Sequence, residues 1–188
     1  KESARHPGGM AAALKLTPEV VEATCAGFSE VWPVNYNCPG QVSCAGNADE
    51  IDAFCNAIKV AGGRAVKLPV SGAFHTPYMK DVEPVLREAL EKMPLQAPQI
   101  PVYANRTAGL YPADRAGITT LLSEQVCHAV RWEDTLRAMA ADGIDTFVEV
   151  GAGATLTGFV RRTLPDATAL TVNDFPSYEA VLKELLGD

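Results

Sequence analysis

An alternation of strand and helix signals over residues 10–70 constrains the fold more than any other feature of this sequence. Residues 10–16, 32–36, 41–45 and 64–70 are short apolar stretches of strand character, bounded by glycine, proline and asparagine. Two segments with apolar side chains at helical spacing separate the first stretch from the second and the third from the fourth. The resulting order is β-α-β-β-α-β, which is the order of a ferredoxin-like split βαβ unit.

Start and stop signals support both helices of this unit. Thr17 followed by Pro18 is a typical helix beginning, and Asn47 or Asp49 is suited to cap the second helix. Gly62 and the glycine after it end that helix before the last strand. The segment from Asn35 to Gln41 contains a C-P-G turn, which predicts that the second and third strands form a hairpin.

The rest of the chain also alternates, with longer helices. We expect a parallel sheet with helices on its faces, in which the strand at 146–150 is buried. Pro84 is expected to loosen or kink the first long helix. The expected helices are 77–93, 118–128, 132–142 and 177–186, and the expected strands are 99–103, 146–150 and 167–172. Two subdomains are predicted, 1–73 and 74–188.

Composition excludes several classes of function. The chain has 188 residues and a net charge of −7 with no dense run of Lys or Arg, which argues against nucleic acid as a partner. No apolar run is long enough to predict a membrane span. The five cysteines are odd in number and lack C-x-x-C spacing. This argues against a disulfide framework and a zinc site, and favours a reducing compartment such as the cytoplasm.

His75 is the histidine whose position most favours chemistry. It lies in S-G-A-F-H-T-P-Y-M, between an apolar strand and a helix that Thr76 and Pro77 are expected to begin. A corner between two subdomains is a place where clefts form, and an imidazole there is a candidate general base. A lone histidine is more often structural, so both interpretations stay open at this point.

Two further motifs have structural alternatives. N-Y-N-C-P-G-Q, beginning at Asn35, is either turn chemistry or a set of amides that line a polar cleft. G-A-G-A-T-L-T-G, at 151–158, resembles a phosphate loop only superficially, and we interpret it as a tight strand-to-helix turn. Glu149 before it is a possible catalytic acid, although such a carboxylate more often caps a helix or pairs with a cation.

The chain offers His75 no evident nucleophile. None of its serines lies in a G-x-S-x-G elbow, and Ser71 and Cys38 are the only conceivable substitutes. The cations available to bind an acidic substrate are not evidently placed at the cleft either, because three arginines lie at expected strand or helix boundaries. These are Arg64, Arg106 and Arg131.

Five motifs, taken in order, resemble the acyltransferase family that includes bacterial malonyl-CoA:acyl carrier protein transacylases and polyketide-synthase acyltransferases. They are P-V-N-Y-N-C-P-G-Q-V, L-P-V-S-G-A-F-H-T-P-Y-M, P-V-Y-A-N, V-R-W and E-V-G-A-G-A-T-L-T-G. The resemblance covers essentially the whole chain. It implies an α/β fold in which a ferredoxin-like small subdomain is inserted into an α/β-hydrolase-like large subdomain, of which this chain has the C-terminal part.

The resemblance also implies roles for particular residues. His75 matches the catalytic histidine, and Gln125 matches the position whose backbone carbonyl holds the imidazole. Asn35 and Asn37 match asparagines that line the cleft, and Phe74 matches an aromatic residue common in members that use malonyl groups. The family's nucleophilic serine and carboxylate-binding arginine precede the first residue of this chain, whose opening reads like the interior of a longer protein.

The implied activity is transfer of malonyl from malonyl-CoA to acyl carrier protein through a malonyl-serine ester, in fatty acid biosynthesis. No metal or redox cofactor is expected, because the coenzyme A thioester is itself the substrate. The alternatives are a polyketide-synthase-type acyltransferase, a thioester hydrolase on the same scaffold, and a non-catalytic module that docks a carrier. We also expect these residues alone to be inactive and to bind the N-terminal segment of the same enzyme.

Overall fold

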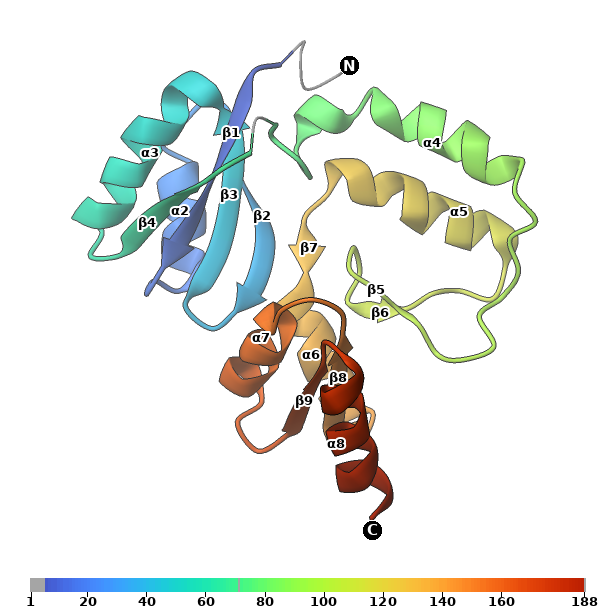
Figure 1. Ribbon diagram of the computed structural model, residues 1–188. Coiled ribbons are helices and arrows are strands. Elements are labelled where there is room, and N and C mark those ends of the chain that lie inside the picture. Colours follow the sequence, from blue (N-terminus) through green and yellow to red (C-terminus); the bar gives the residue numbers. More distant parts are fainter. Residues whose placement is uncertain (1–5, 71, 188) are drawn as a thin grey trace. The chain divides into compact units, whose positions relative to one another are not determined.

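The computed structural model describes residues 6–70 and 72–187, and its contacts divide the chain into two units, 1–135 and 136–188 (Figure 1). The subdomain boundary expected at 73/74 is not tested by this division and stays a prediction. Ser71 lies outside the described residues. Within the described part of the chain, no helix combines the length and the apolar character that crossing a bilayer requires.

The first unit contains a ferredoxin-like sheet, as the sequence predicts. Its strands lie in the order β4-β1-β3-β2, and each is antiparallel to its neighbours. A short fifth strand extends the sheet, because β7 pairs parallel with β2 at Asn35 and Tyr36. The elements of this unit are β1 (Gly8–Leu14), α2 (Pro18–Cys25), β2 (Val31–Cys38), β3 (Gln41–Asn47), α3 (Ala48–Val60), β4 (Arg64–Leu68) and β7 (Val130–Arg131).

Local signals explain these boundaries. The side chain of Asn47 accepts a hydrogen bond from the backbone N–H of Asp49 at 3.0 Å, so Asn47 is the cap of α3. The hairpin between β2 and β3 turns at Gly40, whose φ of +72° suits glycine. Asn35 and Asn37 lie within β2 and not in the turn, so the interpretation of both as turn residues is wrong.

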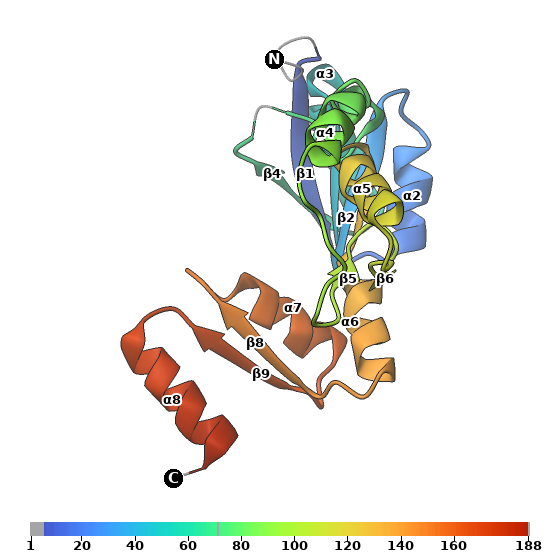
Figure 2. The same cartoon turned by 90° about the vertical axis from the view of Figure 1, so that its right-hand side faces the viewer.

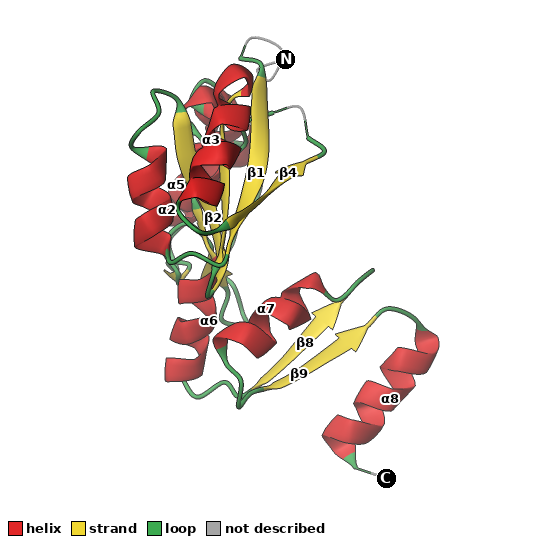
Figure 3. Ribbon diagram, turned by 90° about the vertical axis from the view of Figure 1, so that its left-hand side faces the viewer, coloured by secondary structure: helices red, strands yellow, loops and turns green. Residues whose placement is uncertain are grey.

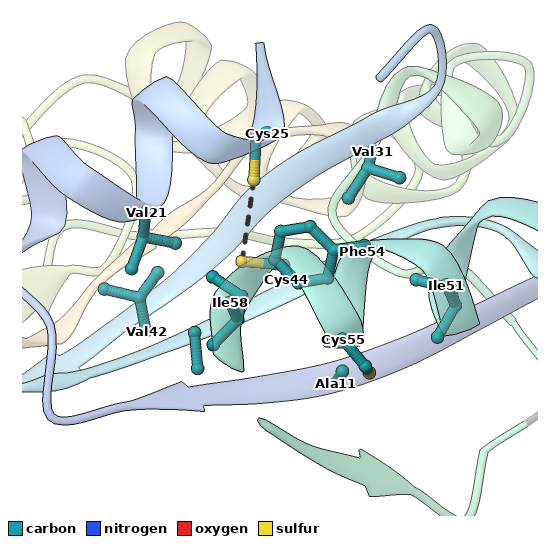
Figure 4. Packing of buried hydrophobic residues seen from close by; sticks show 11 residues of the cluster. Ala11, Val21, Cys25, Val31, Val42, Cys44, Ile51, Phe54, Cys55 and Ile58 are labelled. Atoms are coloured by element: carbon teal, nitrogen blue, oxygen red, sulfur yellow. Dashed lines mark hydrogen bonds between the residues drawn. The ribbon is translucent and has the colours of Figure 1, made fainter. Parts of the chain in front are cut away.

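Helices α2 and α3 cover one face of this sheet (Figure 3). Val21 of α2 and Phe54 and Ile58 of α3 are fully buried against the strands (Figure 4). Cys25 and Cys44 meet in the same core with their Sγ atoms 3.7 Å apart, and all five cysteines are free thiols. Burial of this apolar set provides the main stabilisation of the unit.

The other face of the sheet is covered by the chain that follows β4. Met10, Val34 and Ala45 on this face pack with Ala73, and Tyr78 packs against the same cluster. Residues 72–79 therefore cross the sheet face opposite the two helices. This crossing fixes the place of His75 relative to the strands.

The segment 77–93 differs from the single long helix that its apolar spacing predicts. It consists of a 3₁₀ turn, η1 (Pro77–Met79), and a separate helix, α4 (Val82–Glu91). Pro84 lies in the first turn of α4, where backbone N–H groups have no partner within the helix. A proline cannot donate to the carbonyl of the residue four positions before it, and its ring crowds that carbonyl, which for Pro84 belongs to Lys80. The break at Lys80 and Asp81 therefore lies where Pro84 is expected to interrupt the helix, and the expected loosening is confirmed.

The remainder of the first unit contains one further helical segment and a small hairpin. Helix α5 packs against α4 (Figure 2) and continues into a 3₁₀ turn, η2, which confirms the expected helix at 118–128 in its main part. The strand expected at 99–103 is wrong except at Tyr103, because Pro101 has no N–H to donate to a ladder. The elements are β5 (Tyr103–Ala104), β6 (Gly109–Leu110), α5 (Arg115–Glu124) and η2 (Gln125–Cys127).

The second unit is built on two parallel strands, as the alternating pattern predicts. Strands β8 (Thr146–Val150) and β9 (Thr168–Val172) pair in parallel through the crossover helix α7 (Thr155–Thr163), and α8 (Phe175–Leu186) follows. Helix α6 (Trp132–Ala141) precedes β8 and begins in the first unit.

The expectation that strand β8 is buried is wrong for this chain. Val148 is 39% exposed and Val150 is 77% exposed, and the two side chains lie on the same face because they are two residues apart. Parallel strands usually have both faces covered, whereas within the described part of the second unit this face of β8 is open.

Gly46→Ala tests the register of the ferredoxin-like sheet. A Cβ atom at Gly46 in β3 would lie 1.9 Å from the backbone oxygen of Glu30 and 2.7 Å from Cα of Val31, both of which are backbone atoms. We expect the substitution to lower the free energy of unfolding by about 2 kcal/mol or more, measured by denaturant titration. Gly109→Ala in β6 is the control, because the nearest atom to its Cβ is 3.9 Å away. Equal stability of the two variants would contradict this register.

Candidate active site around His75

His75 occupies a strained backbone corner. Its φ is +62°, a left-handed conformation that costs a non-glycine residue about 1–3 kcal/mol. The residue after it is locked in place, since Thr76 is fully buried and its Oγ1 donates to the backbone oxygen of Ala73 at 2.7 Å. The sequence predicts that the Thr76 hydroxyl caps the following helix. The hydroxyl donates to Ala73 instead, and Thr76 makes no side-chain cap. Strain that the surroundings enforce is a feature of functional corners.

The imidazole of His75 is oriented by a backbone carbonyl. Its Nδ1 lies 2.9 Å from the backbone oxygen of Gln125, and the ring is half-buried. A carbonyl oxygen can only accept, so Nδ1 must carry the proton. In the neutral ring Nε2 then holds the free lone pair, which is the state a general base needs. The contact expected from the resemblance is present, whereas the catalytic role of both residues stays a prediction.

Tyr78 fastens the other end of this corner to the sheet. Its ring stacks on His6 with centroids 4.7 Å apart and meets Trp32 edge-on at 5.4 Å. Burial, together with a hydrogen bond to Glu30, raises the pKa of Tyr78 to about 12. Hydrogen bonds from Asn47 and from Tyr78 lower the pKa of the Glu30 carboxyl. The 3₁₀ turn after His75 is thus held by aromatic packing and by a half-buried polar contact.

Sequence reasoning missed Thr76 and Tyr78 as parts of the site. The sequence offered a signal for Tyr78, because an aromatic residue three positions after His75 can reach back over the strand face. For Thr76 the only signal in the sequence was that of a helix start. In the structure its hydroxyl is buried and donates to the backbone oxygen of Ala73.

The two asparagines expected in the cleft lie on β2, the strand that carries β7. Asn35 pairs with Ser43 of β3 on one side and with Val130 of β7 on the other. Asn37 donates from Nδ2 to Oγ of Ser43 at 3.2 Å. Both side chains are half-buried. Their position in the sheet is established, and their role in binding substrate stays a prediction.

Phe74 immediately precedes His75 and is partly exposed. It is 42% exposed, while its neighbour Ala73 is buried in the sheet-face cluster. An exposed aromatic ring beside a catalytic candidate is suited to contact a ligand. The expected role of Phe74 in substrate binding stays a prediction.

The described residues contain no nucleophile bonded to His75. Among the hydrogen bonds of residues 6–70 and 72–187, none joins a serine hydroxyl to its ring, and Ser177 is used in the capping box of α8. Cys38 is 1% exposed, so burial removes it as a substitute. Arg106 pairs with Glu124 at 3.1 Å, and Arg131 pairs with Asp134 at 2.8 Å.

Neither a metal site nor a phosphate loop takes the place of this chemistry. The described part of the chain has no cluster of three or more His, Cys, Asp or Glu side chains arranged to hold an ion. In the second unit, the Glu149 carboxylate accepts the backbone N–H groups of Leu156 at 3.2 Å and Thr157 at 2.7 Å. These bonds lower the pKa of Glu149. The N-terminus of α7 is therefore already capped, which confirms the capping interpretation.

The chain matches a known protein family over most of its length. The profile of a family described as the acyl transferase domain matches residues 1–182. The malonyl CoA-acyl carrier protein transacylase of Salmonella typhimurium is 34% identical over 181 residues, which are 94% of this chain and 58% of that protein. The polyketide biosynthesis protein ThaF of Burkholderia thailandensis is 38% identical over 167 residues, 87% of this chain and 14% of ThaF.

A solved structure extends the match to the fold. The crystal structure of the acyl-carrier-protein S-malonyltransferase of Burkholderia pseudomallei superposes with a TM-score of 0.90 at 35% identity. The superposition covers 94% of this chain and 59% of that one. The α/β acyltransferase fold inferred from the sequence is therefore confirmed, and the chain spans little more than half of the transacylases that it matches.

Glu149→Gln tests the cap of α7. The pKa of this carboxyl is lowered in the folded state, so its contribution to stability is present above the unfolded pKa and is lost as pH falls through the folded pKa. At pH 7 we expect the variant to be less stable by about 0.5–1 kcal/mol, through the lost charge at the helix N-terminus. The difference should shrink below about pH 4, near the unfolded pKa of a glutamic acid.

The control for this measurement is Glu88→Gln, which removes an exposed i,i+4 ion pair with Lys92. Such pairs contribute little to stability, so in thermal unfolding this variant should be as stable as the parent protein at pH 7 and at pH 3. If the difference in stability between Glu149→Gln and the parent protein is unchanged at pH 3, loss of the carboxylate charge is not its cause.

Proposed function

Because the chain belongs to the acyl transferase domain family, we propose that it is the part of a transacylase that carries the catalytic histidine. The reaction is transfer of malonyl from coenzyme A to the thiol of an acyl carrier protein, in fatty acid biosynthesis. One observation carries the proposal: the backbone carbonyl of Gln125 fixes the proton on Nδ1 of His75 and leaves Nε2 free. The relatives named for malonyl transfer support the choice of substrate.

In the proposed mechanism, His75 acts twice. Nε2 first accepts the proton of a serine hydroxyl while the serine oxygen bonds to the malonyl carbonyl carbon. The carbon–sulfur bond then breaks, and the imidazolium returns the proton to the coenzyme A thiolate. In the second half, the carrier thiol gives its proton to Nε2 and its sulfur bonds to the ester carbonyl carbon. The carbon–oxygen bond to serine then breaks, and the imidazolium returns the proton to the serine oxygen. Each half exchanges one ester or thioester bond, so no metal or redox cofactor is required.

The serine and a second covering layer are proposed to come from the N-terminal segment of the same enzyme. The relatives are longer than this chain, which covers 58% of the Salmonella protein. The exposed face of β8, with Val148 and Val150, is apolar and fits a strand or helix of that segment. Five free thiols suit a reducing compartment, and we propose the cytoplasm as the location.

A polyketide-type acyltransferase is the second candidate. It is favoured by the 38% identity to ThaF, which is named for polyketide biosynthesis. The two functions share the chemistry at His75 and differ in the carrier that accepts the acyl group. The two functions are distinguished by measuring whether the carrier protein of fatty acid synthesis or that of polyketide synthesis is loaded faster.

The proposal is tested by incubating the longest natural chain that contains these residues with labelled malonyl-CoA and acyl carrier protein. We expect label on the carrier thiol. Label released to water would instead indicate a thioester hydrolase, and absence of turnover would indicate a non-catalytic module that docks a carrier. The isolated 188-residue chain should form no malonyl adduct in intact-mass measurements, and an adduct that transfers to carrier protein would overturn the assignment of the serine to another segment.

His75→Ala tests the proposed general base. We expect the rate of acyl transfer to fall by about 10²–10⁴-fold, the range that general-base assistance contributes. His75→Gly is the matched variant, because glycine tolerates the φ of +62° and should preserve or raise the thermal unfolding temperature. Both variants should lose the same activity. Near-normal turnover in either one would make His75 a structural residue.

A further inference from the structure

The side chain of Gln125 makes contacts that its backbone role does not require. Its Nε2 lies 2.9 Å from the backbone oxygen of His128 and 3.4 Å from that of Ala129. Both partners are carbonyl oxygens, so the amide NH₂ must be the donor and its orientation is unambiguous. The backbone oxygen of the same residue faces Nδ1 of His75. One residue therefore binds the catalytic ring with its main chain and its own turn with its side chain.

These side-chain bonds immobilise the peptide that offers the carbonyl. Gln125 begins η2 at the end of α5, and its backbone N–H bonds to the Leu121 oxygen. On its carbonyl side the only backbone bond among the described residues is the closing bond from His128 N–H to the Gln125 oxygen, which is long at 3.4 Å. The carboxamide reaches over this turn to the next two carbonyls. It thereby ties the start of the turn to the chain that enters β7.

The chain segment to which the Gln125 side chain is bonded is held in turn by the ferredoxin-like sheet. Val130 and Arg131, directly after the two carbonyls, form β7 and pair with Asn35 and Tyr36 of β2. The Gln125 side chain thus fixes the direction of the Gln125 backbone carbonyl relative to β2. Any residue supplies a backbone oxygen, but few supply two N–H donors at this reach.

We propose that the carboxamide of Gln125 is a positioning group that aims its own backbone carbonyl at His75 and so sets the Nδ1–H tautomer. Alanine or methionine at this position keeps the carbonyl but loses its anchor, and the turn can then rotate the oxygen away. The imidazole would populate the Nε2–H tautomer, in which Nε2 has no lone pair for a serine proton. The inference deepens the proposed acyl transfer and rests on it only for its kinetic readout.

The first experiment reads the tautomer directly, in the longest natural chain and without substrate. Nitrogen-15 NMR of the imidazole distinguishes protonated from unprotonated Nδ1, and the His75 signals are assigned by their loss in His75→Gln. The parent should show Nδ1–H, and Gln125→Met should show a substantial Nε2–H population. Gln99→Met, at an exposed glutamine, is the control and should match the parent. Because no acyl substrate is used, this result is independent of whether the enzyme transfers malonyl.

The second experiment measures kcat/KM for acyl transfer across pH. Gln125→Met should lose about tenfold, which corresponds to one hydrogen bond that orients the base. Gln125→Glu should lose as much at pH 8, because a carboxylate cannot donate and is repelled by the carbonyls. Those carbonyls raise the pKa of the new acid, so that at pH 5–6 its protonated form donates and kcat/KM recovers relative to Gln125→Met.

Comparing Gln125→Glu with Gln125→Met cancels the effect of the other titrating groups near this turn, because both variants contain them. Glu83, Glu124, Cys127 and His128 are joined by hydrogen bonds around η2 and are present in both proteins, as is His75. A pH-dependent rescue would not arise from a loss of packing volume. The proposal is overturned if Gln125→Met retains the Nδ1–H tautomer, or if Gln125→Glu and Gln125→Met keep a constant ratio of kcat/KM from pH 8 to pH 5. Thermal unfolding of each variant verifies that the compared proteins are folded.

Discussion

The hydrogen bond from Nδ1 of His75 to the backbone oxygen of Gln125 joins two segments 50 residues apart in the sequence, and the geometry of the site depends on it. Each partner belongs to a short, irregular piece of chain: a left-handed corner in one case and a 3₁₀ turn in the other. The corner has no regular ladder to hold it, and the turn keeps only the last helical bond of α5, from Gln125 N–H to the Leu121 oxygen. Each is instead tied to the ferredoxin-like sheet, the first through Tyr78 and the cluster around Ala73, the second through β7.

This arrangement differs electrostatically from a histidine paired with a carboxylate. A carbonyl dipole fixes the tautomer and the ring plane as a carboxylate does, but it would supply less stabilisation to an imidazolium if His75 takes up a proton as proposed. Orientation is then the main contribution of the partner. A site that relies on orientation needs rigid anchors, which accounts for the buried Thr76 hydroxyl bond and the stacked Tyr78 ring beside the catalytic candidate.

The sequence predicted the parts of the fold that local chemistry determines. Asn47 and the turn at Gly40 have their signals within a few residues, so the β-α-β-β-α-β order could be read directly, although strand ends such as those of β1 differ by two residues from the expected ones. The single helix expected over 77–93 is divided in the structure, because the apolar spacing continues across a break at Lys80 and Asp81, where Pro84 cannot donate to the carbonyl four residues before it. The partner of His75 was accessible only through family resemblance, since a backbone carbonyl leaves no trace in residue type. The contacts of the Gln125 side chain had no sequence signal at all.

The second unit shows that local order and complete burial are separate requirements. Glu149 caps α7, and β8 pairs with β9 over its whole length, so the strand–helix–strand element has its hydrogen bonds in place. Its apolar closure is nevertheless incomplete, because Val148 and Val150 face outward on a strand type that is normally covered on both sides. A covering segment would find a preformed surface and would gain apolar burial without having to reorganise the backbone that it meets. The strand–helix–strand element thus has its backbone hydrogen bonds in place and keeps an exposed apolar face of the kind that another strand or helix usually covers.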